Sequence, residues 1–191
     1  GMVVMSKYNG FTIIETMVAL AIVLSLIAIG IPNLNNFIVY TRVDNEIFTL
    51  HRLLLIARNT ALTSNTKVTL CPLNAQEQCQ NLWHQELSVF TDINNNKIYE
   101  PLLNEQLVAH KAAIKTGDKL QYGKTRIGLT YEATGHLVGW GQNATFSYCP
   151  QHHKDKSRGI VVATSGRAYV SAANKTNSKN IRRSGAKIKC F

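Results

Sequence analysis

Four cysteines carry the most reactive side chains of the sequence: Cys71, Cys79, Cys149 and Cys190. His152 and His153 follow Cys149 closely, and thiolate and imidazole are the usual ligands of zinc, so a zinc site is one use of these residues. The other use is two disulfides, which form in chains exported from the reducing cytoplasm. The choice therefore depends on the compartment in which residues 71–190 lie.

A second candidate is "DINNNKIYE" at residues 92–100, which resembles the start of a calcium-binding loop. Asp92, Asn94 and Asn96 occupy positions 1, 3 and 5 of that loop. However, Lys97 replaces the glycine of position 6, and Leu103 stands where position 12 needs a bidentate Glu. We therefore interpret the segment as a polar turn and expect no metal site.

Catalysis would need a nucleophile, a base and a group that orients them. The sequence contains neither a G-x-S-x-G turn nor a phosphate-binding glycine motif. Trp83, Trp140 and Phe90 are expected in the core or in a sheet rather than as surfaces that stack bases. We expect no enzymatic activity and no cofactor.

The positive charge of the chain is concentrated toward its C-terminus. The formal net charge is +10, and residues 154–191 hold a single acid, Asp155, beside these basic residues: Lys154, Lys156, Arg158, Arg167, Lys175, Lys179, Arg182, Arg183, Lys187 and Lys189. Such a stretch is commonly only a solvated face. Clustered cations also bind DNA phosphates without sequence preference, by releasing counterions. These residues are therefore the candidates for DNA binding.

An apolar span at residues 11–31 contains one charged residue, Glu15. As a helix it would be about 31 Å long, which matches the roughly 30 Å hydrocarbon core of a bilayer. Lys7 precedes the span and Arg42 is the first cation after it, which favours a cytoplasmic N-terminus. The rest of the chain would then lie outside the cytoplasm. Disulfides are thus favoured over zinc, and we expect Cys71–Cys79 to close a local loop and Cys149–Cys190 to hold the C-terminus.

The span is expected to continue as an amphipathic helix to residue 64, with a bend at Pro32. Its apolar residues recur at helical spacing and predict one buried stripe: Leu34, Ile38, Val43, Ile47, Leu50, Leu54, Ala57 and Ala61. Short alternating segments follow and predict antiparallel strands at 68–71, 87–91, 127–131, 145–149, 160–164 and 168–171. "TSGRAY" at residues 164–169 predicts a hairpin turn. A sheet packed on the helix gives an α+β domain.

The N-terminal residues "MSKYNG" and "FTIIE" resemble the leader of type IV prepilins and type II secretion pseudopilins. Gly10, Phe11, Glu15 and Pro32 fall at the spacing of that family. The resemblance implies a prepilin peptidase that cleaves after Gly10 and methylates the new amine of Phe11. Glu15 becomes the fifth residue of the mature chain, where its carboxylate pairs with that amine within a subunit or between neighbours.

Three further segments resemble the GspH/FimT family of minor pilins: "ARNTALTSNTKVTLC" at 57–71, "FTDINNN" at 90–96 and "RGIVVATSGRAYV" at 158–170. The resemblance implies the type IV pilin fold and assembly through the N-terminal helix with other major and minor pilins. FimT-like members that bind DNA carry a G-R-x-R motif near the C-terminus. Here Gly166 and Arg167 are present, but Tyr169 replaces the second arginine.

These inferences divide the chain into a leader at 1–10, a transmembrane and polymerisation helix at 11–31, an amphipathic helix at 32–64 and a β-rich head at 65–191. We expect a FimT-like or FimU-like minor pilin, anchored in the bacterial inner membrane with its head in the periplasm, and then part of a pilus. Double-stranded DNA is a further expected partner. Two alternatives stay open: a GspH-like pseudopilin of a type II secretion system, and a membrane-tethered DNA-binding or adhesion module that does not polymerise.

Overall fold

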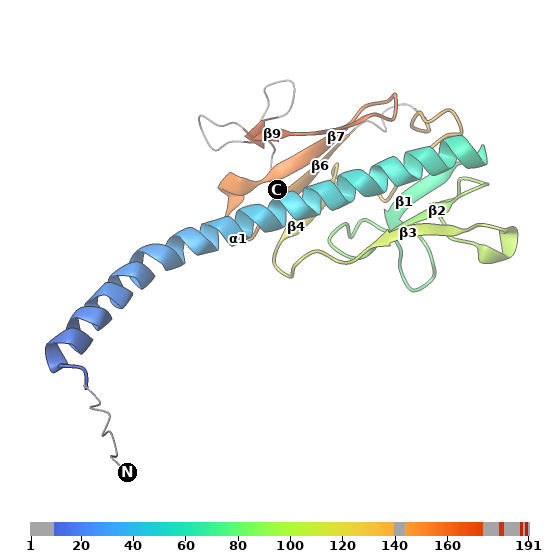
Figure 1. Ribbon diagram of the computed structural model, residues 1–191. Coiled ribbons are helices and arrows are strands. Elements are labelled where there is room, and N and C mark those ends of the chain that lie inside the picture. Colours follow the sequence, from blue (N-terminus) through green and yellow to red (C-terminus); the bar gives the residue numbers. More distant parts are fainter. Residues whose placement is uncertain (1–9, 140–143, 174–179, 182–187, 189, 191) are drawn as a thin grey trace, which may run out of the picture. The chain divides into compact units, whose positions relative to one another are not determined.

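One long helix, two four-stranded antiparallel sheets, a two-stranded ladder and two 3-10 helices make up the regular elements of the described part of the chain (Figure 1). The computed structural model describes residues 10–139, 144–173, 180–181, 188 and 190. The chain divides into two units, Gly1–Ile38 and Val39–Phe191, which we call the stem unit and the head unit. Helix α1 spans Ile13–Ser64 and therefore contributes to both units.

Helix α1 ends where the sequence predicts. The hydroxyl of Ser64 donates to the carbonyl of Thr60 at 2.6 Å, and Asn65 adopts a positive φ of 51°. A residue in the left-handed conformation is a common helix end. The helix is continuous across Pro32, and the expected bend there stays a prediction.

The buried stripe of α1 lies within the head unit. It consists of Val39, Val43, Ile47, Leu50, Leu53, Leu54, Ala57 and Ala61. The sequence prediction was wrong for Leu34 and Ile38, which are 57% and 50% exposed, because the core that covers the helix starts only at Val39. The apolar periodicity continues past the core, so spacing alone does not show where burial stops.

The first sheet has the strand order β3-β2-β1-β5. Its strands are β1 (Val68–Pro72), β2 (Leu87–Thr91), β3 (Leu107–Lys111) and β5 (Leu129–Tyr131). Every residue of β1, β2 and β5 is buried, whereas β3, at the other edge from β5, is buried only at Lys111. Between β2 and β3 lies a 3-10 helix, Pro101–Leu103.

The second sheet has the order β4-β6-β7-β8. Its strands are β4 (Lys119–Tyr122), β6 (Ala144–Cys149), β7 (Arg158–Val162) and β8 (Ala168–Val170), with a 3-10 helix, Lys154–Lys156, before β7. Val162 pairs with Ala168, which confirms the predicted hairpin. A short ladder joins β9 (Ala172–Ala173) and β10 (Asn180–Ile181). The α+β prediction is confirmed, with two main sheets in place of one.

The hydrophobic core joins both sheets to the helix. Trp83 fills its centre, with Tyr122 and Phe146 at 5.2 Å between ring centroids and its Nε1 donating to the carbonyl of Arg126 at 2.7 Å. Trp83 and Phe90 are buried as predicted, and Trp140 lies outside the described residues. Because one cluster contains residues of α1 and of both sheets, the head unit has a single core.

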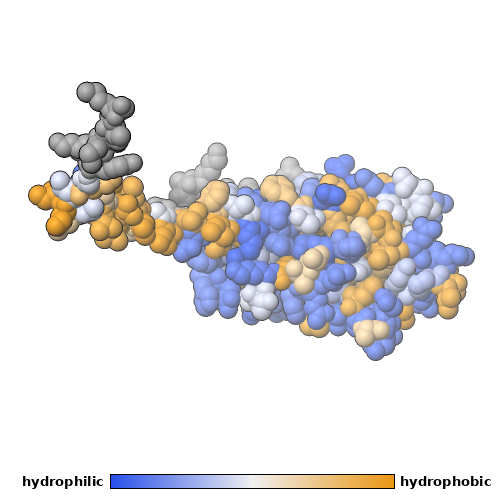
Figure 2. Space-filling model, turned by 60° about the horizontal axis from the view of Figure 1, so that its bottom comes forward, coloured by the Kyte–Doolittle hydropathy of each residue, from blue (hydrophilic) through white to orange (hydrophobic). Residues whose placement is uncertain are grey.

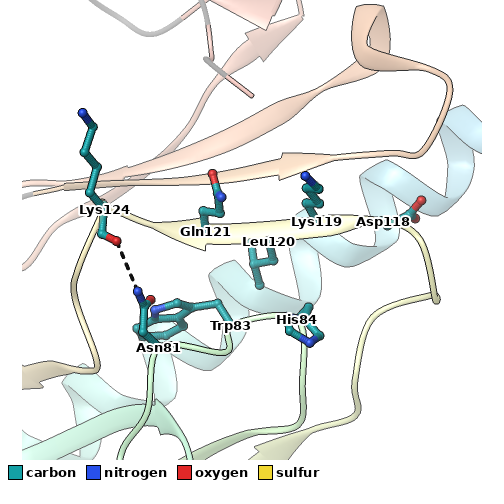
Figure 3. A pocket seen from close by; sticks show the side chains of 9 residues that line it. Asn81, Trp83, His84, Asp118, Lys119, Leu120, Gln121 and Lys124 are labelled. Carbon is teal, nitrogen blue, oxygen red and sulfur yellow. Dashed lines mark hydrogen bonds between the residues drawn. The ribbon is translucent and has the colours of Figure 1, made fainter. Parts of the chain in front are cut away.

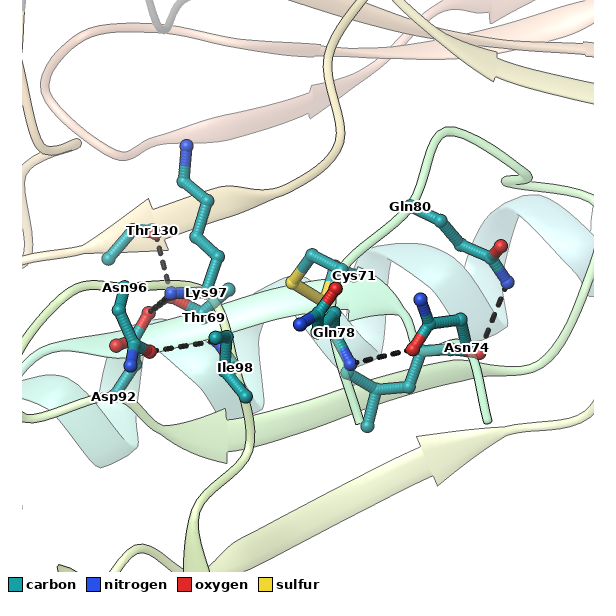
Figure 4. The surroundings of a disulfide bond; sticks show 12 residues. Thr69, Cys71, Asn74, Gln78, Gln80, Asp92, Asn96, Lys97, Ile98 and Thr130 are labelled. Atoms are coloured by element: carbon teal, nitrogen blue, oxygen red, sulfur yellow. Dashed lines mark hydrogen bonds between the residues drawn. A yellow bond between two sulfur atoms is a disulfide. The ribbon is translucent and has the colours of Figure 1, made fainter. Parts of the chain in front are cut away.

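Both predicted disulfides are confirmed: Cys71–Cys79, with 5.5 Å between Cα atoms, and Cys149–Cys190, with 6.0 Å. The first closes the loop after β1, as Figure 4 shows. The second ties residue 190 to the end of β6 across 41 residues of sequence. The described end of the chain is thereby attached to the second sheet.

Within the described residues, three ion pairs connect α1 to the rest of the head unit. Arg42 pairs with Asp118 (3.0 Å), Glu46 with Lys111 (2.5 Å) and Asp44 with Arg158. Arg42 and Glu46 are one turn apart and share a side of the helix, whereas Asp44 projects from another side. The helix is thus held by charge contacts on two sides.

Candidate assembly and polyanion-binding sites

The first turn of α1 positions Glu15. Thr12 lies just before the helix, and its Oγ1 accepts the backbone N–H of Glu15 at 3.3 Å. A threonine at this place satisfies one of the unpaired N–H groups of a helix start. The side chain of Glu15 is exposed, and the ion pairs found among the described residues involve other acids. Its carboxylate is therefore available to a partner.

Exposed apolar side chains cover α1 before the head unit begins, from Ile13 to Ile38. Among them Ile14, Leu24 and Phe37 are each more than 60% exposed. Figure 2 shows the same stretch as a hydrophobic surface. In length and composition α1 could cross a membrane, and its most apolar window has no buried residue. A helix that is apolar on all sides needs a lipid or protein environment.

The candidate DNA-binding residues occupy different environments. Lys154 and Arg167 are exposed, and Lys156 is half-buried. Arg158 is only 8% exposed, pairs with Asp44 and donates from Nη2 to the carbonyl of Ser171 at 3.2 Å. Arg158 is therefore removed from the candidate phosphate contacts, because its guanidinium is already bound inside the head. The remaining candidates lie outside the described residues: Lys175, Lys179, Arg182, Arg183, Lys187 and Lys189.

The residues that resemble the G-R-x-R motif lie in the hairpin between β7 and β8. Gly166 has a φ of +75°, and a Cβ on it would lie 1.9 Å from the carbonyl oxygen of Gly135. This glycine is required by the turn and by the close approach of residue 135. Arg167 points into solvent beside it, and Tyr169 is half-buried in β8.

Sequence reasoning missed Asp118, which is the centre of a buried polar cluster. Its Oδ2 contacts Arg42 Nε at 3.0 Å and accepts the Tyr148 hydroxyl at 2.5 Å, and its Oδ1 accepts the N–H of Gln151 at 2.8 Å. Burial, reinforced by this hydrogen bond to a carboxylate, raises the pKa of Tyr148. No short sequence signal marks the cluster, since its members come from distant segments.

A pocket of about 460 Å³ lies beside β4 (Figure 3). Trp83 and Leu120 form its apolar part, and Asn81, His84 and Lys119 are among its polar residues. The described lining includes no Ser, Thr or Cys that a base could activate. Likewise, no three His, Cys, Asp or Glu side chains of the described residues are placed to hold a metal ion.

A long apolar N-terminal helix packed on a β-rich head defines a pilin-like subunit. The N-terminal methylation motif matches residues 5–31, and the family described as "Type II transport protein GspH" matches residues 47–166. The chain belongs to the GspH family. It is accordingly a minor pilin or pseudopilin, the kind of subunit found in type IV pili or type II secretion systems.

The fold is similar to that of a solved minor pilin structure. The type IV minor pilin FimU of Pseudomonas aeruginosa superposes with a TM-score of 0.56 at 18% identity, over 71% of this chain and 92% of FimU. The minor pseudopilin EpsH of the Vibrio cholerae type 2 secretion system gives a TM-score of 0.49 at 12% identity, over 70% of this chain and 99% of EpsH. The comparison with curated protein sequences gives no match. The similarity to FimU confirms the predicted type IV pilin fold.

Proposed function

We propose that the chain is a minor pilin of a type IV pilus and enters the filament through the N-terminal part of α1. The observation that carries this proposal is the exposed apolar surface of residues 13–38, in which Glu15 is the one charged side chain. Such a surface suits a bilayer before assembly and a bundle of like helices afterwards. FimU, which shares the fold, is itself a type IV minor pilin.

In this proposal the N-terminus is cytoplasmic and the head is periplasmic until assembly. Prepilin peptidase cleaves between Gly10 and Phe11 and methylates the amine of Phe11. Gly10 is exposed, and apart from its chain neighbours no described residue lies within 4 Å of the position of a Cβ, which is consistent with access for a protease. The positive amine then lies close in sequence to Glu15, whose carboxylate is costly in a bilayer unless it is paired.

Processing is tested by mass spectrometry of the chain purified from its host. The expected mature N-terminus is N-methylated Phe11. An unprocessed chain, or a terminus elsewhere, would contradict the assigned cleavage site.

To distinguish a pilus from a secretion pseudopilus, sheared surface filaments are probed for the chain in strains that lack either assembly system. If the chain disappears from the sheared fraction only in the pilus-deficient strain, the proposal is supported. If it disappears only in the secretion-deficient strain, the chain is a pseudopilin.

A second proposed function is sequence-independent DNA binding by the basic C-terminal segment, in support of DNA uptake during natural transformation. Its support is the cluster of basic residues in 154–191, of which Lys154 and Arg167 are exposed. Counterion release makes such binding depend strongly on salt.

Duplex DNA binding is measured with residues 38–191, which include the described core and both disulfides. Affinity should fall steeply between low and moderate salt. The double variant Arg182→Ala, Arg183→Ala should reduce affinity for all sequences alike and flatten the salt slope. Arg52→Ala, which removes an exposed cation of α1, is the matched control and should leave affinity unchanged. Salt-independent or absent binding would remove this function.

A further inference from the structure

The loop that follows β2 begins with a fully buried carboxylate. Asp92 is 0% exposed, and its Oδ2 accepts hydrogen bonds from Thr69 Oγ1 at 2.6 Å and from the Lys97 backbone N–H at 3.2 Å. Its Oδ1 is also buried but has no hydrogen-bond partner within the described part of the chain. A buried carboxylate oxygen without a donor is costly, and a cation is one group that satisfies it.

Three further oxygen-bearing side chains of this loop converge. Glu100 Oε2 lies 3.0 Å from Asn94 Nδ2 and 2.7 Å from Asn96 Nδ2. The amide oxygens are held in place because Asn94 Oδ1 accepts the Asn96 N–H at 3.1 Å and Asn96 Oδ1 accepts the Ile98 N–H at 2.9 Å. Each amide oxygen retains a second lone pair. The three side chains are therefore linked to one another, and their oxygens keep capacity for another contact.

The positions of these groups match the first nine residues of a calcium-binding loop. Such a loop supplies ligands from positions 1, 3, 5, 9 and the backbone carbonyl of position 7. Counted from Asp92, these are Asn94, Asn96, Glu100 and the carbonyl of Ile98. The similarity to a calcium-binding loop therefore includes the hydrogen bonds of these side chains as well as their residue types.

The structure also answers the objection raised by Lys97. That residue has a φ of +61°, so it adopts the left-handed conformation for which glycine is preferred at position 6. Figure 4 shows its side chain extending away from Asp92 and Asn96. The lysine thus adopts the conformation that the turn needs, and its side chain does not approach the carboxylate.

A different carboxylate stabilises the loop in place of the missing position-12 ligand. Glu105 is 3% exposed, and its two oxygens accept the N–H groups of Ile93 at 3.0 Å and Glu100 at 2.8 Å. The N–H of Cys79, a disulfide residue, donates to the carbonyl of Lys97 at 2.9 Å. The loop is therefore held at both ends and along one side, which reduces the entropy lost when a ligand binds.

We propose that residues 92–100 form a divalent cation site for Ca²⁺. Its ligands are the side chains of Asp92, Asn94, Asn96 and Glu100 and the carbonyl oxygen of Ile98. An all-oxygen set with two carboxylates and neutral oxygens suits Ca²⁺, and so few charges place the dissociation constant at about 10⁻⁴ to 10⁻³ M, as in extracellular modules. This site revises the polar-turn interpretation and is independent of the proposed assembly function.

The test uses the full chain in detergent micelles, freed of metal with EDTA. Thermal unfolding is recorded with about 5 mM CaCl₂ and with NaCl of equal ionic strength, and binding is measured by titration calorimetry with CaCl₂ alone. Ca²⁺ should raise Tm by about 3–6 °C relative to NaCl, through binding to the folded state. Glu100→Gln and Asn94→Ala should each weaken Ca²⁺ binding by about tenfold.

Glu86→Gln is the matched control, because it removes one exposed carboxylate outside the loop. It should respond to Ca²⁺ like the wild type. The proposal is overturned if the wild type shows no binding heat and no Tm increase beyond that in NaCl. It is equally overturned if Glu100→Gln and Asn94→Ala, both folded, bind Ca²⁺ as well as the wild type.

Discussion

Arg158 at the start of β7 is ion-paired with Asp44 of α1 inside the head unit. The guanidinium also donates to the carbonyl of Ser171 and lies 5.8 Å from the ring centroid of Phe48. One side chain thereby links the helix to the second sheet. Arg158 therefore differs from the neighbouring basic residues in its role, because its charge is neutralised inside the protein.

The Arg158→Ala variant should therefore lose stability rather than DNA affinity. Removing one partner leaves the Asp44 carboxylate, which is largely shielded from solvent, without its cation and should reduce the free energy of unfolding by about 2–3 kcal/mol. Urea unfolding of the head measures this loss. Arg167→Ala is the control, and as a change of an exposed residue it should alter stability by less than about 0.5 kcal/mol. Equal stability of the two variants would contradict the structural role of Arg158.

Alkaline conditions should destabilise the head through its buried tyrosines. Burial raises the pKa values of Tyr122 and Tyr131 above their ordinary value of 10.0. Because the unfolded chain loses these protons first, the stability they contribute is complete below about pH 10 and decreases as the pH rises through the folded-state values. Urea midpoints at increasing pH, together with tyrosinate absorbance, measure this effect.

Tyr131→Phe provides the internal check for the alkaline prediction. The Tyr131 hydroxyl is buried and has no hydrogen-bond partner among the described residues, so its removal should leave neutral-pH stability unchanged or slightly increased. Above about pH 10, the free energy of unfolding of Tyr131→Phe should decrease less than that of the wild type. If the wild type and Tyr131→Phe lose the same stability at alkaline pH, groups other than Tyr131 cause the loss.

The two disulfides should contribute unequally. Cys149–Cys190 spans 41 residues and Cys71–Cys79 spans eight. Loop-closure entropy in the unfolded chain predicts contributions of about 4 and about 2.5 kcal/mol, respectively. Paired Cys→Ser variants of each bridge, compared by urea unfolding, measure the difference. A larger loss for the short bridge would mean that native contacts, and not chain entropy, determine the effect.

Sequence patterns predicted the parts of the fold that follow local rules. The end of α1, the buried strands β1 and β2 and the β7–β8 hairpin carry clear periodicity or turn residues. Strand β3 was missed because it is an edge strand with only one buried residue, and β4 because Lys119 and Gln121 interrupt its apolar pattern. Edge and short polar strands depend on their neighbours more than on their own composition.

The candidate sites differ in the same way: some are marked by residues close in sequence, whereas others form only when distant residues meet. Glu15 and Gly10 were identified from residues a few positions apart. The pairing of Arg158 with Asp44 joins positions 114 apart, and nothing in the local sequence distinguishes that arginine from Arg167. For the loop that begins at Asp92, the residue types alone fit both a polar turn and a calcium-binding loop. The unpaired Oδ1 of Asp92 and the positive φ of Lys97 favour the cation site.

We propose that the Glu15 carboxylate pairs with the amine of Phe11 of a neighbouring subunit and so registers one subunit against the next within a filament. Incorporation of Glu15→Leu into filaments measures this role directly. The ratio of the chain in sheared filaments to the chain in membranes is determined for wild type, Glu15→Leu and the carboxylate-retaining control Glu15→Asp. Glu15→Leu should be inserted and cleaved normally but strongly depleted from filaments, because the pairing is lost, whereas Glu15→Asp should be retained better. Normal incorporation of Glu15→Leu would contradict this role.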